Sequence, residues 1–332
     1  MRLALLLMSF TAAVAQTPQW VMEESGTEAS LRGVSAVTRN VVWASGSGGT
    51  WLRTADGGAT WHAGKVSGAE DLDFRGIQAL SETTAVLMSA GPGTKSRVYK
   101  TTDSGSHWEL LFTNPDAEGF WDSIAFWDEA HGILAGDAVN GQIAMFTTDD
   151  AGRTWNRQEL PPALSKEGAF AASNSSLFVA AFGAEVWFGS SASRFFRSYD
   201  RGRTWIVRPT PVRKTSDSSG IFSIASSNGR YGVAVGGDYT KETEAQNNIA
   251  VTNDGGLAWT TPAKGPAGFR SAVLWLRRKN AWLVTGTSGS DIGVDGNWTT
   301  FDKGAFNALS ANMDGDVWAV GPKGRIAKLE MK

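Results

Sequence analysis

Charged side chains stand near the start of several short segments in which apolar and polar residues alternate. Three of these segments, "LRGVSAV", "FRGIQAL" and "FRSAVLW", carry an arginine at Arg32, Arg75 and Arg270. Comparable places in related segments hold Asp122, Glu167 and Asn307. A guanidinium presents a planar set of donors that matches a carboxylate or a phosphate. The arginines therefore indicate recognition of an anionic group.

A second set of polar residues lies in loops further along the same units, with "GDAVNG", "GGDYTKETEAQNN" and "GSD" as the richest loops. The candidate ligand-binding residues of both sets are Arg32, Arg75, Asp122, Asp137, Glu167, Asp238, Tyr239, Arg270, Ser290 and Asp291. The alternative is structural, because arginines and acids also bridge neighbouring units of a repeat protein. Asp238 and Tyr239 are the least suited to that alternative, since they lie in the longest insertion.

Two classes of function fit these residues. In the first, the protein is a binding or assembly module that holds a peptide, a partner protein or an anionic small molecule. In the second, it is a glycoside hydrolase in which Arg32, Arg75 and Arg270 hold an acidic sugar. Its acid, base or nucleophile would then come from Asp122, Asp137, Glu167, Asp238 or Tyr239. A glycosidase needs two carboxyl groups roughly 5 to 9.5 Å apart, or a tyrosine nucleophile. The sequence alone leaves both classes open.

One turn recurs through most of the chain and indicates the architecture. Five copies obey Ser/Thr-x-Asp-x-Gly-x-x-Trp: "TADGGATW", "TTDSGSHW", "TDDAGRTW", "SYDRGRTW" and "TNDGGLAW". "GVDGNW" is a worn sixth copy. Successive tryptophans are 47, 47, 50, 54 and 39 residues apart. This period is typical of the four-stranded blades of a β-propeller.

Each residue type in the repeated turn has a structural role. The aspartate can accept hydrogen bonds from the backbone of its own turn, and the glycine supplies a positive φ without steric cost. The tryptophan opens the outgoing strand, where its ring can fill the space between sheets. We therefore interpret five aspartates as structural: Asp56, Asp103, Asp150, Asp200 and Asp254.

Seven inner strands are expected, beginning at "LRGVSAV", "FRGIQAL", "FWDSIAF", "GAFAAS", "GIFSIAS", "FRSAVLW" and "FNALSAN". The last unit stops after three strands, and 19–21 near the N-terminus look like its missing fourth strand. The predicted fold is all-β: a single seven-bladed propeller of four-stranded antiparallel blades, closed by the N-terminal strand. The strand starts and the loops between second and third strands then converge at one mouth of the central channel. The repeated turns lie at the opposite face.

The repeated turn is the Asp-box, and the chain resembles the Asp-box (BNR repeat) propellers, which include sialidases, xyloglucanases and photosystem II assembly factors. "AHGILAGD", "RYGVAVGGD" and "DVWAVGPKGRIAKL" are most similar to the assembly-factor (YCF48-like) branch and its bacterial secreted relatives. The resemblance implies the fold, whereas members of this superfamily range from hydrolases to scaffolds. "LRGV" and "FRGI" keep the arginine but lack the proline of the sialidase Arg-Ile-Pro element. The chain also has room for one propeller, where xyloglucanases use two.

The N-terminus and the composition indicate the location of the protein and limit its partners. Arg2, the apolar run 3–10 and small residues ending at Ala15 predict a signal peptide, residues 1–15, ahead of a propeller spanning 16–332. We expect an exported, periplasmic or extracellular monomer without a transmembrane segment. A net charge of −2 argues against nucleic acid as a partner. The absence of cysteine and the scattered histidines predict no disulfide, metal or cofactor.

Overall fold

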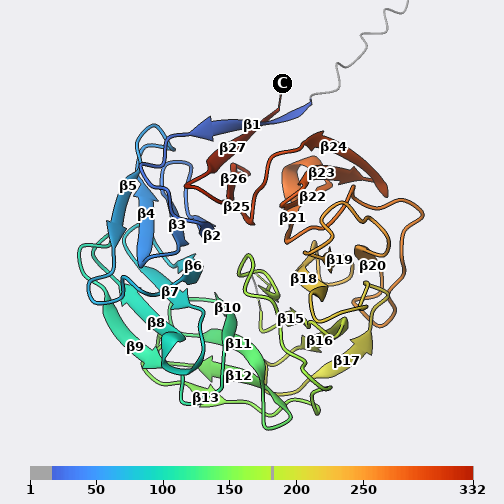
Figure 1. Ribbon diagram of the computed structural model, residues 1–332, viewed down its shortest axis with the longest axis horizontal. Helices are drawn as coiled ribbons and strands as arrows, with labels where there is room; N and C mark the ends of the chain where they lie inside the picture. Colours follow the sequence, from blue (N-terminus) through green and yellow to red (C-terminus); the bar gives the residue numbers. More distant parts are fainter. Residues whose placement is uncertain (1–16, 181–182, 332) are drawn as a thin grey trace, which may run out of the picture.

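Seven antiparallel sheets follow one another along the chain and surround a central axis as the blades of a propeller (Figure 1). This computed structural model describes residues 17–180 and 183–331. The predicted signal peptide, residues 1–15, lies outside the described residues. Among the residues that are described, no helix has the length and apolar character needed to cross a membrane.

The first three blades each contain four strands. Blade 1 comprises β2 (Leu31–Ala36), β3 (Val42–Gly46), β4 (Thr50–Thr54) and β5 (His62–Lys65). Blade 2 comprises β6 (Phe74–Ala79), β7 (Ala85–Ser89), β8 (Arg97–Thr101) and β9 (Glu109–Thr113), with the 3₁₀ turn η1 (Gly93–Lys95) between β7 and β8. Blade 3 comprises β10 (Trp121–Phe126), β11 (Gly132–Val139), β12 (Gln142–Thr148) and β13 (Asn156–Arg157).

The remaining blades complete the ring. Blade 4 comprises β14 (Leu177–Val179), β15 (Val186–Gly189), β16 (Arg194–Ser198) and β17 (Ile206–Pro209). Blade 5 comprises β18 (Ser219–Ser226), β19 (Gly232–Asp238) and β20 (Ile249–Thr252). Blade 6 comprises β21 (Ala272–Leu276), β22 (Ala281–Gly286), β23 (Gly289–Val294) and β24 (Asn297–Asp302), with η2 (Arg277–Lys279) after β21. Blade 7 comprises β25 (Ala308–Ala311), β26 (Val317–Val320), β27 (Ile326–Met331) and the N-terminal β1 (Pro18–Glu23).

Pairing of β1 with β27 closes the ring, as the sequence predicts. The two strands pair over six residues, from Pro18 with Met331 to Glu23 with Ile326. Trp20 anchors β1 because its ring packs on Phe301 and Phe306, and its Nε1 donates to Ser290 Oγ at 3.0 Å. The pairing covers the edge that β27 would otherwise expose.

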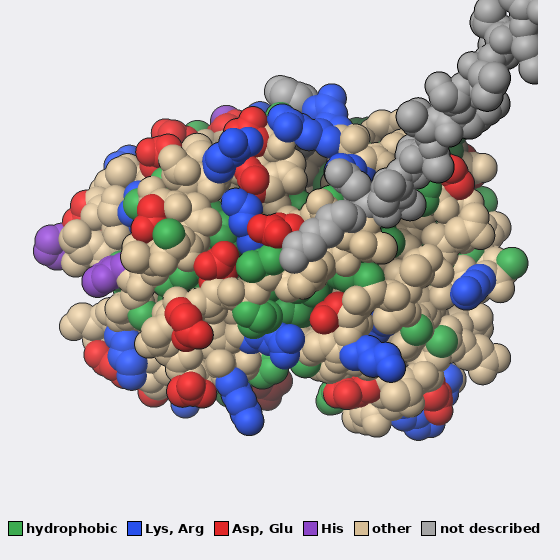
Figure 2. All heavy atoms as spheres, turned by 90° about the horizontal axis from the view of Figure 1, so that it is seen from above, with side chains coloured by type: hydrophobic (Ala, Val, Ile, Leu, Met, Phe, Trp, Pro, Cys, Tyr) green, Lys and Arg blue, Asp and Glu red, His purple; other side chains and the backbone are tan. Residues whose placement is uncertain are grey.

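The hydrophobic core lies between blades rather than in one central layer. The second strand of most blades is buried along its length, because neighbouring blades cover both of its faces, as in β3 and β7. One cluster joins Trp43 and Trp51 of blade 1 to Phe74, Leu87 and Tyr99 of blade 2. The edge of the ring carries interspersed acidic and basic side chains (Figure 2). Apolar packing between blades therefore fixes the ring, and polar groups cover its outside.

The five Asp-box turns have the geometry expected from their residues. In the first, Thr54 Oγ1 donates to Asp56 Oδ1 at 2.8 Å, and Asp56 Oδ1 accepts from Thr60 N at 2.9 Å. The glycine lies in the left-handed region, with φ of 99° at Gly58. The tryptophan packs on the preceding blade, as Trp61 does on Trp318 with centroids 5.7 Å apart. The turns are therefore structural parts of the blades.

Two details of the predicted blades differ in the structure. "GAFAAS" (168–173) is not the inner strand of blade 4, which is β14, starting at Leu177. The alternation of that stretch was misleading, because 168–173 form irregular backbone inside the ring. Blade 5 has three strands, and only the isolated bridge between Val251 and Thr260 marks its fourth.

Candidate ligand-binding cavity

A β-bulge recurs near the start of four inner strands and turns one side chain of each toward the axis. The pairing of β2 with β3 passes from Leu31 to Gly33 and skips Arg32. The same shift skips Arg75 in β6, Asp122 in β10 and Phe222 in β18. A bulge re-aims the residue it leaves unpaired. These side chains therefore border one cavity at the channel mouth.

The equivalent position in blades 6 and 7 follows from a glycine near the end of each second strand. In five blades this glycine lies so close to the inner strand that a Cβ on it would meet a backbone carbonyl oxygen there. The carbonyl belongs to Ser30, Phe120, Gly220, Phe269 or Ala305. In blades 1, 3 and 5 the cavity-facing residue comes two positions after that carbonyl. The cavity-facing residues of blades 6 and 7 are thus Ser271 and Asn307. We call Arg32, Arg75, Asp122, Phe222, Ser271 and Asn307 the floor positions.

Arg270 stands one residue before its floor position, so the sequence alignment of "FRS" with "FRG" is wrong by one residue. Arg270 replaces the core residue that is Leu31 in blade 1, and its side chain is fully buried. Its Nε donates to Asp291 Oδ2 at 2.6 Å, and its Nη1 donates to Ser288 Oγ at 2.9 Å. A buried guanidinium needs such a partner. Arg270 and Asp291 therefore form an ion pair inside blade 6.

A segment of blade 4, residues 168–175, reaches into the centre of the ring (Figure 1), where residues 169–172 line the cavity. Arg75 Nη1 donates to the carbonyl oxygen of Ala171 at 3.3 Å, and Ser173 Oγ donates to that of Ser271 at 2.7 Å. Asn174 exchanges two hydrogen bonds with the backbone of Ile124. These contacts tie the segment to blades 2, 3 and 6. We call it the crossing segment.

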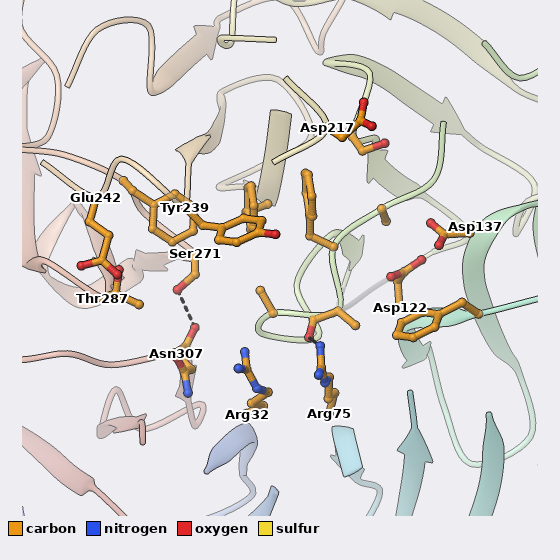
Figure 3. Close-up of a pocket in the computed structure, with 18 of the residues that line it drawn as sticks. Arg32, Arg75, Asp122, Asp137, Asp217, Tyr239, Glu242, Ser271, Thr287 and Asn307 are labelled. Atoms are coloured by element: carbon orange, nitrogen blue, oxygen red, sulfur yellow. Dashed lines mark hydrogen bonds between the residues drawn. The ribbon is translucent and has the colours of Figure 1, made fainter. Parts of the chain in front are cut away.

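The floor positions, the crossing segment and several loops, among them the one that carries Tyr239 and Glu242, line a cavity of about 560 Å³ (Figure 3). Six residues that the sequence analysis singled out line it: Arg32, Arg75, Asp122, Asp137, Tyr239 and Asn307. The cavity is large enough for a short peptide segment or a small molecule. Its two arginines, its acid pair and its aromatic wall come from different blades.

Arg32 and Arg75 stand side by side at one side of the cavity (Figure 3). Arg75 is held by Asp73, whose Oδ2 lies 2.7 Å from Arg75 Nε. Arg32 has no hydrogen bond or ion pair with any residue of 17–180 or 183–331. Burial, followed by the like charge of Arg75, lowers the pKa of Arg32 from its ordinary value. A guanidinium remains charged despite such a shift, so Arg32 presents free donors to a ligand.

Asp122 and Asp137 form an acid pair beside the arginines. Burial raises the pKa of Asp122 well above its usual range, and the nearby charge of Asp137 raises it further. Burial likewise raises the pKa of Asp137 to about 6. Asp122 is only 2% exposed, and its Oδ2 has no hydrogen-bond partner among the described residues. The pair therefore retains a proton well above the pH at which ordinary aspartates lose theirs.

An aromatic wall faces the arginines across the cavity. Phe170 of the crossing segment stacks on Phe222 with centroids 3.8 Å apart, and Phe269 meets Phe222 edge-on at 4.6 Å. Tyr239 lies 6.2 Å from Phe222 in a T-shaped arrangement and remains 50% exposed. The wall thus offers the exposed Tyr239 supported by the half-buried Phe170 and the buried Phe222 and Phe269.

Three other candidate residues lie away from the cavity and form hydrogen bonds within the protein. Glu167 is bonded to Ser190 and forms an ion pair with Arg194. Asp238 accepts from Ser216, Ser218 and Thr240. Ser290 accepts from Trp20 and lies 2.8 Å from Thr285 Oγ1.

The phenylalanines of the wall were not among the candidates from the sequence, because only charged and polar residues at the strand starts were considered. Phe222 could have been found by placing "IFSIAS" under "LRGVSA", where it stands beneath Arg32. Phe170 could not have been found in this way, because "GAFAAS" (168–173) was predicted to be the inner strand of blade 4. Lys166, Asp217 and Glu242 also line the cavity, from irregular loops.

The fold and its five Asp-box turns define an Asp-box β-propeller, and comparisons with known proteins agree. The family model described as "Photosynthesis system II assembly factor YCF48" matches residues 12–157. This match confirms the resemblance to YCF48-like propellers over the first part of the chain. A search of curated proteins by sequence found no match.

Solved structures of three relatives have the same fold. "YCF48 bound to D1 peptide" has a TM-score of 0.64 at 16% identity, covering 93% of this chain and 96% of that chain. "YCF48 from Cyanidioschyzon merolae" has a TM-score of 0.62 at 15% identity, with 93% and 98% covered. A streptogramin B lyase has a TM-score of 0.69 at 15% identity, with 95% and 98% covered. At these identities the likeness shows the fold alone, and the function must be argued from the site.

Proposed function

We propose that this protein is an exported binding or assembly module that holds a carboxylate-bearing peptide segment of a partner protein in the cavity. The observation that carries the proposal is Arg32: its guanidinium borders the cavity, beside Arg75, without a partner among the described residues. A carboxylate would supply the missing acceptors in a charge-assisted hydrogen bond. The structure of YCF48 with a D1 peptide supports the proposal, because it pairs this fold with a peptide.

The arginine cluster required by the glycoside hydrolase alternative is not assembled. That alternative used Arg32, Arg75 and Arg270 to hold an acidic sugar, but Arg270 is enclosed in blade 6 with Asp291. Glu167 is likewise bonded to Arg194. Such contacts between arginines and acids favour the binding module over the hydrolase. The acid pair of Asp122 and Asp137 then adjusts the charge of the cavity.

The proposal is tested with acetyl-Ala-Ala-Ala-Phe, prepared either with a free terminal carboxylate or as the amide. We expect the carboxylate to bind the wild-type protein at least about tenfold more tightly, because a charge-assisted hydrogen bond contributes on the order of 1.5 to 3 kcal/mol. The Arg32→Met variant should bind both forms equally weakly. Isothermal titration calorimetry measures the affinities.

Arg230→Met is the matched control, because Arg230 lies in the loop between β18 and β19, at the end of the strands away from Tyr239. It should bind as the wild type does. Equal affinity for the two peptides in the wild type, or unchanged affinity in Arg32→Met, would contradict the proposal. Turnover of fluorogenic sialosides or uronides by the same samples would favour the hydrolase.

Export rests on the sequence of residues 1–15 and is part of the proposal. Cleavage after Ala15 leaves β1 intact, since this strand begins at Pro18. The intact mass of the protein recovered from the periplasm or the medium should correspond to a chain that starts at Gln16. Recovery of the uncleaved chain from the cytoplasm alone would contradict export.

A further inference from the structure

The aromatic wall lies across the cavity from the arginines, where a ligand fixed by its carboxylate would place its neighbouring side chain (Figure 3). We propose that Tyr239, Phe222 and Phe170 form a side-chain subsite, so that the protein selects peptides with an aromatic or large aliphatic residue at the carboxylate. This inference rests on the proposed function and adds the specificity of the same cavity.

Exposure of Tyr239 is the first observation behind the inference. Tyr239 is 50% exposed, whereas Phe170 is half-buried and Phe222 and Phe269 are 3% and 2% exposed. Tyr239 therefore keeps much of its surface in contact with water at the cavity. Covering such a ring with an apolar side chain is favourable, and aromatic pairs gain further from edge-to-face packing.

Rigid support of Tyr239 is the second observation. The adjacent Asp238 is 3% exposed and accepts hydrogen bonds from Ser218 Oγ at 2.7 Å and from Ser216 Oγ at 3.0 Å. Thr240 donates to the same carboxylate through both its backbone N, at 3.0 Å, and its Oγ1, at 2.7 Å. These bonds join the start of the β19–β20 loop to the connection between blades 4 and 5. Asp238 is thus a positioning residue that holds Tyr239 in place before a ligand arrives.

Stacking of the supporting rings is the third observation. Phe170 and Phe222 stack face to face, and Tyr239 meets both edge-on, at 6.5 and 6.2 Å. Phe170 comes from the crossing segment and Phe222 from a floor position, so both are tied to the ring. A subsite on rigid elements loses little entropy when it binds. The wall is therefore ready to receive a side chain without rearrangement.

The test uses peptides acetyl-Ala-Ala-Ala-X with a free carboxylate, where X is Phe, Leu, Ala or Asp. The wild-type protein should bind the Phe and Leu peptides about tenfold more tightly than the Ala and Asp peptides, as burial of one large apolar side chain implies. Tyr239→Ala should bind all four with the affinity that the wild type shows for the Ala peptide. Tyr239→Phe should keep the selectivity, since the ring rather than the hydroxyl makes the subsite.

Tyr231→Ala is the matched control. Tyr231 is also 50% exposed but follows the loop between β18 and β19, at the other end of these strands. It should keep the wild-type selectivity. Asp238→Ala should reduce the preference for Phe while leaving the affinity for the Ala peptide unchanged, which a general loss of folding would not do. Circular dichroism confirms that each variant is folded.

The outcomes separate the two proposals. Equal affinity of the wild type for all four carboxylate peptides, with the amides bound more weakly, would overturn the side-chain subsite and leave carboxylate binding intact. A preference for Phe that persists in Tyr239→Ala would also overturn it. Binding of none of the peptides would overturn the proposed function, and the subsite with it.

Discussion

At the scale of the residue, the same β-bulge presents very different side chains to the cavity in different blades. The bulge that skips Arg32, Arg75, Asp122 and Phe222 leaves the fold unchanged whichever side chain it carries. The chemistry of the cavity is therefore set at a few positions, apart from the core residues that hold the blades. Arg270 shows the other case, since an arginine at a core position needs a buried partner.

The acid pair makes stability depend on pH. Because the folded protein raises the pKa of both Asp122 and Asp137, it binds protons more tightly than the unfolded chain does. The pair therefore lowers the free energy of unfolding as the pH rises from about 4 through about 6 and beyond. Asp122→Asn should have the stability of the wild type near pH 4 and should be the more stable of the two at pH 8.

Urea unfolding at several pH values measures this difference. Asp71→Asn is the control, since the side chain of Asp71 is 68% exposed, and it should follow the wild type throughout. An Asp122→Asn variant that is less stable at pH 8 than the wild type would show that the pair stabilises the fold and would contradict the assignment.

At the scale of the element, the crossing segment supplies part of the lining of the cavity. Glu167 precedes it and is 1% exposed, with its Oε1 2.8 Å from Arg194 Nε and its Oε2 2.8 Å from Leu164 N. Its exposed neighbour Lys166 pairs with Asp217 at 2.8 Å, where both side chains are 75% exposed. The segment is thus held by one buried pair and one solvated pair.

Loss of the buried pair should destabilise the protein far more than loss of the solvated one. Glu167→Ala leaves Arg194 without its carboxylate and should lower the free energy of unfolding by about 3 kcal/mol. Lys166→Ala should change it by less than about 0.5 kcal/mol. Hydrogen exchange of residues 168–175 should be faster in Glu167→Ala alone. Equal effects of the two substitutions would contradict this account of the segment.

The elements also show how far the sequence could be interpreted. The Asp-box turns were predictable because hydrogen bonds within each turn require Asp and Ser or Thr at fixed spacing. The crossing segment was not, since its backbone is held by distant partners such as Arg75 and Ser271. The floor position of blade 6, Ser271, was missed because "FRS" resembles "FRG". Arg75 occupies its floor position, whereas Arg270 stands one residue before its own. Sequence patterns within one turn therefore identify the turns, whereas contacts between blades determine which residue of each inner strand faces the cavity.

At the scale of the whole molecule, the ring depends on a strand from the opposite end of the chain. Trp20 of β1 is 7% exposed and joins blade 7 to Phe301 of blade 6. Trp20→Ala should lower the free energy of unfolding by about 3 to 5 kcal/mol. Met22 of the same strand is 48% exposed, so Met22→Ala should have an effect below about 1 kcal/mol. Urea unfolding tests both, and a mild effect of Trp20→Ala would show that β1 contributes little to closure.

Both proposals place the ligand in the cavity rather than on the outer strands or at the Asp-box face. A crystal structure of the protein with acetyl-Ala-Ala-Ala-Phe tests this placement most directly. We expect the terminal carboxylate within hydrogen-bonding distance of the Arg32 guanidinium and the phenyl ring against Tyr239. A peptide bound at any other place, with the cavity holding solvent alone, would contradict it.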